Sequence, residues 1–367
     1  MGWPIVPGFD VAGVVEAAGA DSGFAAGDAV YGCTLFGAYS TRVLIPSRQL
    51  QPKPRGLAFE DAAALPAVAG TALHALALAG FWAAPPPPRP PHPSSSSSPP
   101  SPPTSPSLTR NRAVLIHSAA GGVGSMLVQM SKLLGCSPVV AVVGSSHKVA
   151  HCRALGADAV IDKSAFKATG GDASVELWAA VAAAAPAAFS GKYGAVFDAN
   201  GVSTLRRSFD ALDRCGRLVV YGFHSNLPRG VHLLDPFAWL KMAIGVARMP
   251  SFDPMEMVLE SKAVLGFNLS FFADETAVIK AYLRQINDWV TAGKIQVGKV
   301  TVFDSMAEVG KAHQLIQSGN SVGKIVVRAC AAAAAAAAED DVDGPAAAAA
   351  ATQGSSSEAA TSAKKSA

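Results

Sequence analysis

The sequence has few of the residues that mark disulfide-rich, nucleic-acid-binding or membrane-spanning proteins. Its five cysteines stand singly, without a Cys-x-x-Cys pair, which argues against a four-thiolate zinc site and a redox dithiol. Aromatic residues make up only 7%, and the formal charge of +3 is not gathered into a Lys/Arg stripe, so we expect no nucleic-acid partner. No run of 18 bulky apolar residues occurs, and no basic stretch leads into an apolar one at the start. We therefore expect reduced thiols, a cytoplasmic location and no transmembrane segment.

Half of the 367 residues are hydrophobic, which is enough for a large core, but two segments of low complexity stand outside it. Residues 84–110 are a Pro/Ser tract that predicts a disordered insertion. Lengthening a loop from about 6 to about 27 residues costs only about 1.3 kcal/mol of closure entropy, so the fold can tolerate it. Residues 331–367, an alanine run followed by Asp, Ser and Lys, predict a low-complexity tail.

The stretch with the clearest chemical meaning is residues 113–124, Ala-Val-Leu-Ile-His-Ser-Ala-Ala-Gly-Gly-Val-Gly. It predicts a buried strand at 114–116 and a glycine turn, with a helix over 125–134 behind them. The turn reads Ala119-x-Gly121-x-x-Gly124, with alanine in place of the usual first glycine. A helix N-terminus after such a turn binds a pyrophosphate. We therefore predict that the turn residues contact a dinucleotide, namely Ala120, Gly121, Gly122, Val123 and Gly124; a plain tight turn is the alternative.

Strands and helices alternate from residue 111 onward. Five further strands are predicted at 139–143, 159–161, 195–198, 217–221 and 263–267, with helices at 148–155, 175–185 and 204–212. Six strands with helical crossovers predict an α/β fold with a doubly wound parallel sheet, the Rossmann nucleotide-binding domain. The first 80 residues are β-rich, with strands predicted at 11–16, 29–31 and 38–45 and helices at 59–65 and 71–79. Helices at 274–291 and 306–317 and a strand at 324–327 close the ordered chain.

The end of the second Rossmann strand bears on the choice of cofactor. An acidic residue there would bind a ribose 2′-OH and select NAD, and it would repel a 2′-phosphate by up to about 4 kcal/mol. This strand instead ends in Gly144-Ser-Ser-His-Lys148, without an acid. Ser145 and Ser146 can donate hydrogen bonds to a phosphate and Lys148 can pair with it, so we predict NADPH. The alternative is that these residues cap the next helix.

Ligands of open α/β sheets bind at the carboxyl ends of the strands. Asn200 follows the fourth strand, and Gly222, Phe223 and His224 follow the fifth, so we expect all four at the cofactor. His224 is a weak candidate for a proton donor; the alternative is an ordinary polar loop residue.

The chain resembles the medium-chain dehydrogenase/reductase superfamily, in its zinc-free quinone oxidoreductase branch, which includes the VAT-1-like proteins. The matching phrases run in one consistent order: Pro7-Gly-Phe-Asp-Val-Ala-Gly-Val-Val-Glu16, Gly27-Asp-Ala-Val30, Gly37-Ala-Tyr39, Phe59-Glu-Asp-Ala-Ala-Ala-Leu-Pro66, Ala119–Gly124, Leu155-Gly-Ala-Asp158, Phe197-Asp198, Gly216-Arg-Leu-Val219 and Val322-Gly-Lys324. The resemblance implies a mostly-β GroES-like domain over 1–83, here lacking its usual N-terminal strands, and a Rossmann NADPH-binding domain over 111–268. Residues 269–330 would return to the GroES-like domain, with NADPH in the cleft between the two.

The resemblance also implies roles for single residues. Thr71 matches a threonine near the nicotinamide amide, with a helix N-cap as the alternative. Lys163 stands where the family often has a tyrosine after the third strand, and Phe267 and Asn268 would flank the nicotinamide. Gly8-Phe-Asp10 replaces the Gly-His-Glu of zinc-dependent relatives. Asp10 and Cys33 alone are too few ligands, so we expect no metal.

These observations predict a zinc-independent, NADPH-dependent oxidoreductase that transfers hydride to a quinone or an α,β-unsaturated carbonyl. In such a reaction the cofactor carries the chemistry and solvent can supply the proton. One alternative is a VAT-1-like, NADPH-binding protein associated with membranes or lipids, with weak or no catalysis. Another is an inactive truncated homologue. The resemblance further implies a homodimer formed through the sheet edges of the nucleotide domain.

Overall fold

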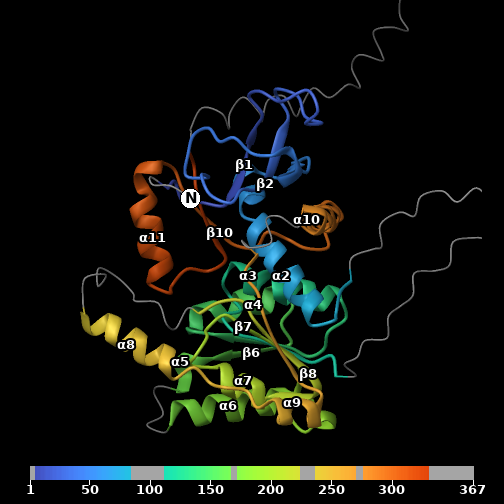
Figure 1. The fold of residues 1–367 in the computed structure, drawn as a ribbon, viewed down its shortest axis with the longest axis vertical. Helices are drawn as coiled ribbons and strands as arrows, with labels where there is room; N and C mark the ends of the chain where they lie inside the picture. The colour runs from blue at the N-terminus through green and yellow to red at the C-terminus, as the bar shows by residue number, and fades with distance from the viewer. Residues whose placement is uncertain (1–4, 84–110, 167–171, 224–235, 270–275, 330–367) are drawn as a thin grey trace, which may run out of the picture.

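The computed structural model describes residues 5–83, 111–166, 172–223, 236–269 and 276–329. The predicted insertion at 84–110, the tail at 331–367 and His224 lie outside these residues. A three-stranded sheet and its helices stack on a larger α/β layer, and strands from both ends of the chain lie near the junction (Figure 1).

The α/β layer is a six-stranded parallel sheet in the order β6-β5-β4-β7-β8-β9. Its strands are β4 (Val114–Ile116), β5 (Val139–Val143), β6 (Ala159–Asp162), β7 (Tyr193–Asp198), β8 (Leu212–Val220) and β9 (Ala263–Gly266). In order along the chain this is 3-2-1-4-5-6, the doubly wound order, which confirms the predicted Rossmann fold. The order reverses between β4 and β7, so a ligand crevice is expected beyond the carboxyl ends of these two strands.

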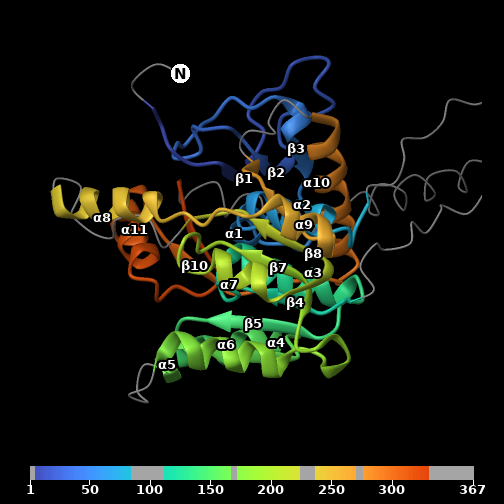
Figure 2. The same cartoon turned by 60° about the horizontal axis from the view of Figure 1, so that its bottom comes forward.

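Helices cover both faces of this sheet because its strands are apolar on both sides. On one face, alternate residues such as Val114, Ile116 and Val139 pack with α2 (Pro66–Leu78), α3 (Gly122–Leu133) and α4 (Val149–Ala154). On the other, Leu115 and Val140 pack with α6 (Ala173–Ala184), α7 (Leu205–Asp210) and α9 (Pro254–Glu260). Figure 1 shows the sheet between these two layers, and Figure 2 shows the same molecule turned by 60°.

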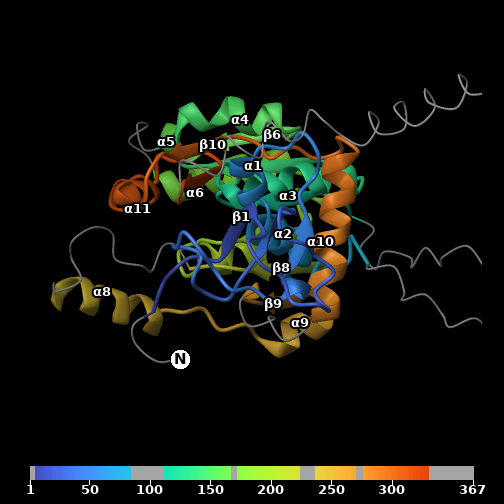
Figure 3. The same cartoon turned by 90° about the horizontal axis from the view of Figure 1, so that it is seen from above.

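The smaller sheet is antiparallel and consists of β1 (Asp10–Val14), β2 (Ala29–Cys33) and β3 (Leu50–Pro52). Helix α1 (Phe59–Ala63) leads from it into α2, and α10 (Thr276–Thr291) packs along α2 (Figure 3). The described chain ends in a parallel pair of strands, β10 (Val300–Phe303) and β11 (Lys324–Val327). Helix α11 (Val309–Gln317) connects them in sequence. Two short helical elements are α5 (Lys163–Phe166) and η1 (Ser47–Gln49). Helix α8 (Pro236–Ala247) extends away from the rest of the molecule in Figures 1, 2 and 3.

Three predicted elements need correction. Residues 38–45 do not form a strand: their backbone bonds to residues 6–8 stop at Tyr39, and Leu44 is 98% exposed. Apolar character alone cannot make a strand where no neighbouring strand supplies a ladder of hydrogen bonds. Helix α2 starts at Pro66 rather than at Thr71, because proline fits the first helical turn. Helix α3 starts at Gly122, three residues earlier than predicted.

The C-terminal strand pair is tied directly to the glycine turn. Gly121 and Gly323 form a parallel β-bridge, and the Gly323 N–H donates to the Ala120 carbonyl at 2.8 Å. Gly323 has a φ of +70°, and a Cβ there would lie 1.9 Å from the Lys299 carbonyl oxygen. This position therefore requires glycine.

Among the described helices, none has both the length and the apolar character needed to cross a membrane.

Candidate active site

The glycine turn lines a large cleft beyond the carboxyl ends of β4 and β7. The cleft has a volume of ≈ 2110 Å³, and all five predicted turn residues, 120–124, line it. A Cβ on Gly124 would lie 2.5 Å from the Ser118 carbonyl oxygen and 2.6 Å from the Ala119 Cα, so glycine alone allows α3 to pack this closely on β4. Gly121 precedes the first turn of α3, whose backbone N–H groups and dipole favour an anion.

One end of the cleft contains the residues predicted to select the cofactor. Ser145, Lys148 and Lys163 line it, and Ser146 does not. The Lys148 ammonium donates to the Gly319 carbonyl at 2.5 Å, across 171 residues of sequence, and burial lowers its pKa. The alternative interpretation, that these residues cap a helix, holds only for the backbone: Ser145 stands at the N-cap position of η2 (Ser146–Lys148), but neither η2 nor α4 has a side-chain cap.

A buried carboxylate holds the end of β7 in place. Asp198 is fully buried and accepts hydrogen bonds from the Asn200 and Gly201 N–H groups and from the Thr204 and Ser208 hydroxyls, at 2.7–3.1 Å. The Asn200 side chain, which lines the cleft, accepts a hydrogen bond from the Ser118 hydroxyl at 2.8 Å. The structure thus fixes Asn200 beside the glycine turn, as its place after the fourth strand predicted.

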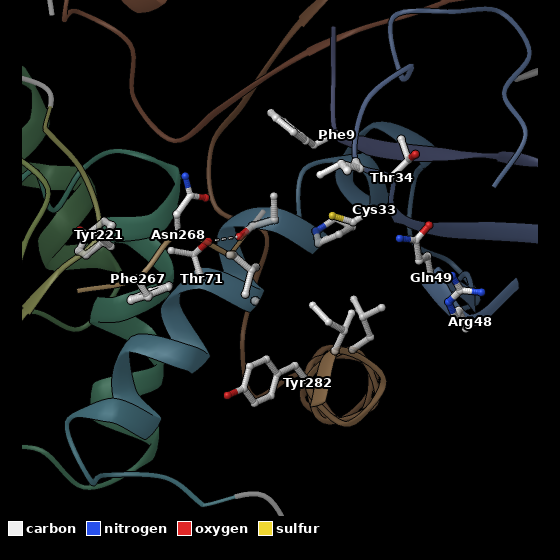
Figure 4. A pocket seen from close by; sticks show the side chains of 17 residues that line it. Phe9, Cys33, Thr34, Arg48, Gln49, Thr71, Tyr221, Phe267, Asn268 and Tyr282 are labelled. Carbon is white, nitrogen blue, oxygen red and sulfur yellow. Dashed lines mark hydrogen bonds between the residues drawn. The ribbon is translucent and has the colours of Figure 1, made fainter. Parts of the chain in front are cut away.

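An apolar pocket opens beside the middle of the cleft. Its volume is ≈ 160 Å³, and it shares Phe9, Thr71 and Tyr221 with the cleft. Phe267 and Asn268 also line it, as Figure 4 shows. Tyr221 comes directly after β8, and Phe267 and Asn268 come directly after β9, so these residues lie at the carboxyl edge of the large sheet. The three shared residues join the cleft and the pocket into one site.

Thr71 lies in the middle of α2, so the N-cap alternative for it is wrong. Its hydroxyl donates to the Ala67 carbonyl one turn back, at 2.6 Å. Because this hydroxyl has a single proton, it can act toward a ligand only as an acceptor while that bond is made.

The pocket also contains side chains that the sequence did not single out. The Tyr282 hydroxyl and His74 Nδ1 lie 2.7 Å apart at the α10–α2 contact, and burial raises the pKa of Tyr282. Burial also raises the pKa of Tyr221 and, together with the Asp10 charge, raises that of the Cys33 thiol to about 12. Cys33 is therefore a neutral thiol at pH 7. Tyr221 stands at the end of the fifth predicted strand. This position is the one signal in the sequence that could have indicated Tyr221 as a site residue.

Three of the predicted site residues lie elsewhere. Gly222 and Phe223 are outside the residues that line the cleft or the pocket, like Ser146. A Cβ on Gly222 would lie 3.1 Å from the Ala199 carbonyl oxygen, and one on Gly201 would lie 2.6 Å from the Phe223 ring. Gly222 and Phe223 therefore pack against the turn after β7. Their contact with a cofactor stays a prediction.

The described residues contain no group of three or more His, Cys, Asp or Glu side chains that could hold a metal ion. Both carboxylate oxygens of Asp10 already have partners: one accepts the Ala67 N–H at 2.7 Å, and the other lies 2.6 Å from the Lys324 ammonium.

Comparison with known proteins places the chain in a family. Residues 122–284 match the zinc-binding dehydrogenase family model, and residues 1–55 match the alcohol dehydrogenase GroES-like domain. The chain is 31% identical over 169 residues to the 2-methylene-furan-3-one reductase of Solanum lycopersicum, covering 43% of this chain and 37% of that protein. It is 24% identical over 327 residues to the synaptic vesicle membrane protein VAT-1 homolog of Danio rerio, covering 88% of this chain and 58% of that protein. The chain thus spans less than two thirds of the length of either relative.

Solved structures agree with the fold. The quinone oxidoreductase of Thermus thermophilus, solved alone and with NADPH, matches with a TM-score of 0.61 at 25% identity, over 89% of this chain and 82% of that one. The human VAT-1 homolog-like protein matches with a TM-score of 0.62 at 20% identity, over 89% and 80%. With two family models in the expected order, a doubly wound sheet and a glycine turn at its switch point, the chain belongs to the medium-chain dehydrogenase/reductase superfamily, in its zinc-free, quinone oxidoreductase-like branch.

Proposed function

We propose that this protein is an NADPH-dependent oxidoreductase that reduces a quinone or an α,β-unsaturated carbonyl without a metal. The observation that carries the proposal is the junction of the two spaces: an apolar pocket opens onto the cleft of the glycine turn and shares Phe9, Thr71 and Tyr221 with it. A flat apolar acceptor in the pocket would thus lie beside whatever occupies the middle of the cleft.

The residues of the cleft fit NADPH. The backbone N–H groups of Gly121–Gly124, at the N-terminus of α3, would bind the pyrophosphate. The glycines there let the backbone approach it closely. Ser145 and Lys148 would receive the 2′-phosphate, and no acidic side chain follows β5 to repel it. Two relatives support this choice, because the Thermus thermophilus enzyme was also solved in complex with NADPH and an Arabidopsis thaliana relative is an NADPH-dependent alkenal/one oxidoreductase.

The chain's own contribution is binding, orientation and exclusion of water. Bound NADPH would supply the hydride. Thr71 can accept a hydrogen bond from a carboxamide, and Asn200 and Asn268 lie at strand ends where polar contacts fix a ring. Burial keeps the Tyr221 phenol protonated, so it can donate a hydrogen bond but cannot act as a base at neutral pH. No described acid faces the pocket, so the proton would come from solvent.

The test follows NADPH oxidation by its absorbance, with 1,2-naphthoquinone and with a simple enone as acceptors. We expect turnover by the wild-type protein and its loss in Gly121→Asp, because a carboxylate would replace the pyrophosphate at the helix N-terminus. Gly19→Asp is the matched control, since no atom lies within 4 Å of the position of its Cβ. NADPH binding without turnover of either acceptor would overturn the enzymatic proposal and favour an inactive homologue.

A second candidate function is binding to an anionic membrane surface, and α8 favours it. Phe237 is 78% exposed, and Trp239, Leu240, Ile244 and Val246 are also exposed. Residues 236–252 contain Lys241 and Arg248 and no acid. Exposed aromatic and aliphatic side chains on a helix without acidic residues are typical of interfacial binding.

Sedimentation with vesicles tests this function. The protein should sediment with phosphatidylserine vesicles more than with phosphatidylcholine vesicles, and Leu240→Glu with Ile244→Glu should abolish the difference. Met255→Glu with Val258→Glu on α9 is the matched control, because both residues are exposed there and the charge change is equal. Equal sedimentation with both lipids would contradict the membrane role.

The division into domains, the cytoplasmic location and the homodimer also stay proposals. Strands β1–β3 fall within 1–83, β4–β9 within 111–268, and β10 and β11 within 269–330, which supports the division. Strand β9 lies at an edge of the large sheet, where a second copy could pair with it. Light scattering after gel filtration would show whether the protein is a dimer.

A further inference from the structure

Arg48 differs in charge from every other residue that lines the apolar pocket. Among the seventeen described residues that line it, Arg48 is the one with a charged side chain. Figure 4 shows Arg48 and Gln49 at one end of the pocket, with Tyr221, Phe267 and Asn268 at the other. The pocket therefore has a cofactor end, an apolar middle and a cationic end.

The chain holds Arg48 at a fixed place. Arg48 is the middle residue of η1, whose turn is closed by the Gln49 N–H donating to the Pro46 carbonyl at 2.9 Å. A Cβ on Gly32 of β2 would lie 2.0 Å from the Gln49 carbonyl oxygen, so the two backbones are in direct contact. Helix α10 also packs against η1. The backbone at Arg48 is thus held by a sheet strand and a helix, while its side chain is exposed.

Arg48 also has no acidic partner within the chain as the structure describes it. Three other arginines, Arg42, Arg206 and Arg328, each pair with an aspartate or glutamate at 2.7–3.3 Å, whereas no ion pair among the described residues includes Arg48. The described residues that line the pocket include no Asp or Glu. A planar guanidinium with five N–H donors, beside an apolar pocket whose described lining offers it no acid, is suited to bind a carboxylate of a ligand.

We propose that the pocket selects acceptors that carry a carboxylate, joined by a short apolar linker to the enone or quinone that is reduced, and that Arg48 is the residue that recognises this carboxylate. This inference rests on the proposed function. A cavity of about 150 Å³ holds one benzene ring, so ≈ 160 Å³ accommodates a small ring or a short carbon chain. Phe9, Leu35 and Ile279 would contact the linker, and the carboxylate would meet Arg48 at the exposed end.

The test compares 7-oxooct-5-enoate with its methyl ester, since the two have the same reacting double bond and differ only in the charge of the tail. For the wild-type protein we expect a KM for the acid up to about 5-fold below that for the ester, the effect of one ion pair at an exposed site. In Arg48→Gln the ratio should fall to about one, and Arg48→Lys should retain part of it. Arg55→Gln removes a nearby exposed arginine that does not line the pocket, and it should leave the ratio unchanged.

A binding measurement separates this inference from the proposed function. Calorimetry with the NADPH-loaded protein compares the saturated ketone 7-oxooctanoate with its methyl ester, and it needs no turnover. Tighter binding of the acid that is lost in Arg48→Gln supports the inference even if no acceptor is reduced, a result that would sink only the enzymatic proposal. Equal binding of acid and ester by the wild type, or a preference that survives in Arg48→Gln, would overturn the inference.

Discussion

The Lys324 ammonium lies 2.6 Å from the Asp10 carboxylate, although 314 residues separate them in sequence. The second carboxylate oxygen accepts the Ala67 N–H at the start of α2. One aspartate thus joins the first strand of the chain, the last strand described and the helix that carries Thr71. This contact joins segments of the cleft lining that are far apart along the backbone.

Asp10→Ala should destabilise the protein by about 2–4 kcal/mol, because it leaves a half-buried ammonium and a helix N–H without their partner. Urea denaturation measures this change. The matched control is Glu16→Ala, whose ion pair with Arg42 is exposed on both sides and should contribute less than about 1 kcal/mol. Equal losses for the two variants would show that the Asp10 contact does not hold these segments together.

Gly124→Ala should lower stability by about 1–3 kcal/mol and weaken NADPH binding. The new Cβ would lie 2.5 Å from a backbone oxygen and 2.6 Å from a backbone carbon, neither of which can move without shifting the turn. Gly19→Ala, with open space around its Cβ, is the control. A Gly124→Ala variant with wild-type stability and affinity would refute the close packing of α3 on β4.

Lys148→Ala should weaken NADPH binding about 10- to 100-fold, the effect of losing a charge-assisted phosphate contact, and NADH binding much less. Calorimetric titration with each nucleotide gives the two ratios. Lys294→Ala, an exposed lysine outside the cleft, should change neither. Equal losses for NADPH and NADH would contradict the assignment of Lys148 to the 2′-phosphate.

Stability should fall as the pH is lowered from 7.5 to 5.5, and His117 should account for part of the fall. His117 is fully buried with its Nε2 3.1 Å from the Ser208 hydroxyl; burial and the Lys163 charge lower its pKa, against an opposing effect of Asp198. Below the ordinary histidine pKa the unfolded chain binds a proton that the folded chain does not, so stability is lost there.

At one pH unit below that pKa, a single buried imidazole contributes at most about 1.4 kcal/mol to this loss. His117→Asn should therefore reduce the difference in unfolding free energy between pH 7.5 and 5.5 by up to that amount. An unchanged difference in His117→Asn would contradict the assignment.

Much of the cofactor site could be predicted from the sequence, because its signals are local. A strand, a glycine turn and a helix follow one another within 113–134, and the carboxyl ends of parallel strands must share one edge. Asn200 lines the cleft beside the glycine turn, as its position after a strand predicts, and its contact with a cofactor stays a prediction. The strand wrongly predicted at 38–45 shows the limit of this reasoning, since a strand depends on a partner that local sequence does not reveal.

Contacts between distant parts of the chain could not be predicted. Lys148 meets Gly319, and Gly121 meets Gly323, through the return of the C-terminal strands to the glycine turn. The apolar pocket forms in the same way, because Cys33, Thr71 and Tyr282 come from three elements far apart in sequence. The family resemblance indicates Thr71 as a site residue. Its position in the middle of α2 depends on the start of that helix at Pro66.

We propose that hydride passes from NADPH in the cleft to an acceptor in the apolar pocket. Mass spectrometry of the enone product, formed with NADPH deuterated at one face of the nicotinamide C4, follows this hydride. We expect one deuterium in the product from one of the two labelled forms and none from the other. A product without deuterium from either form, or bound NADPH that reduces no quinone or enone, would contradict it.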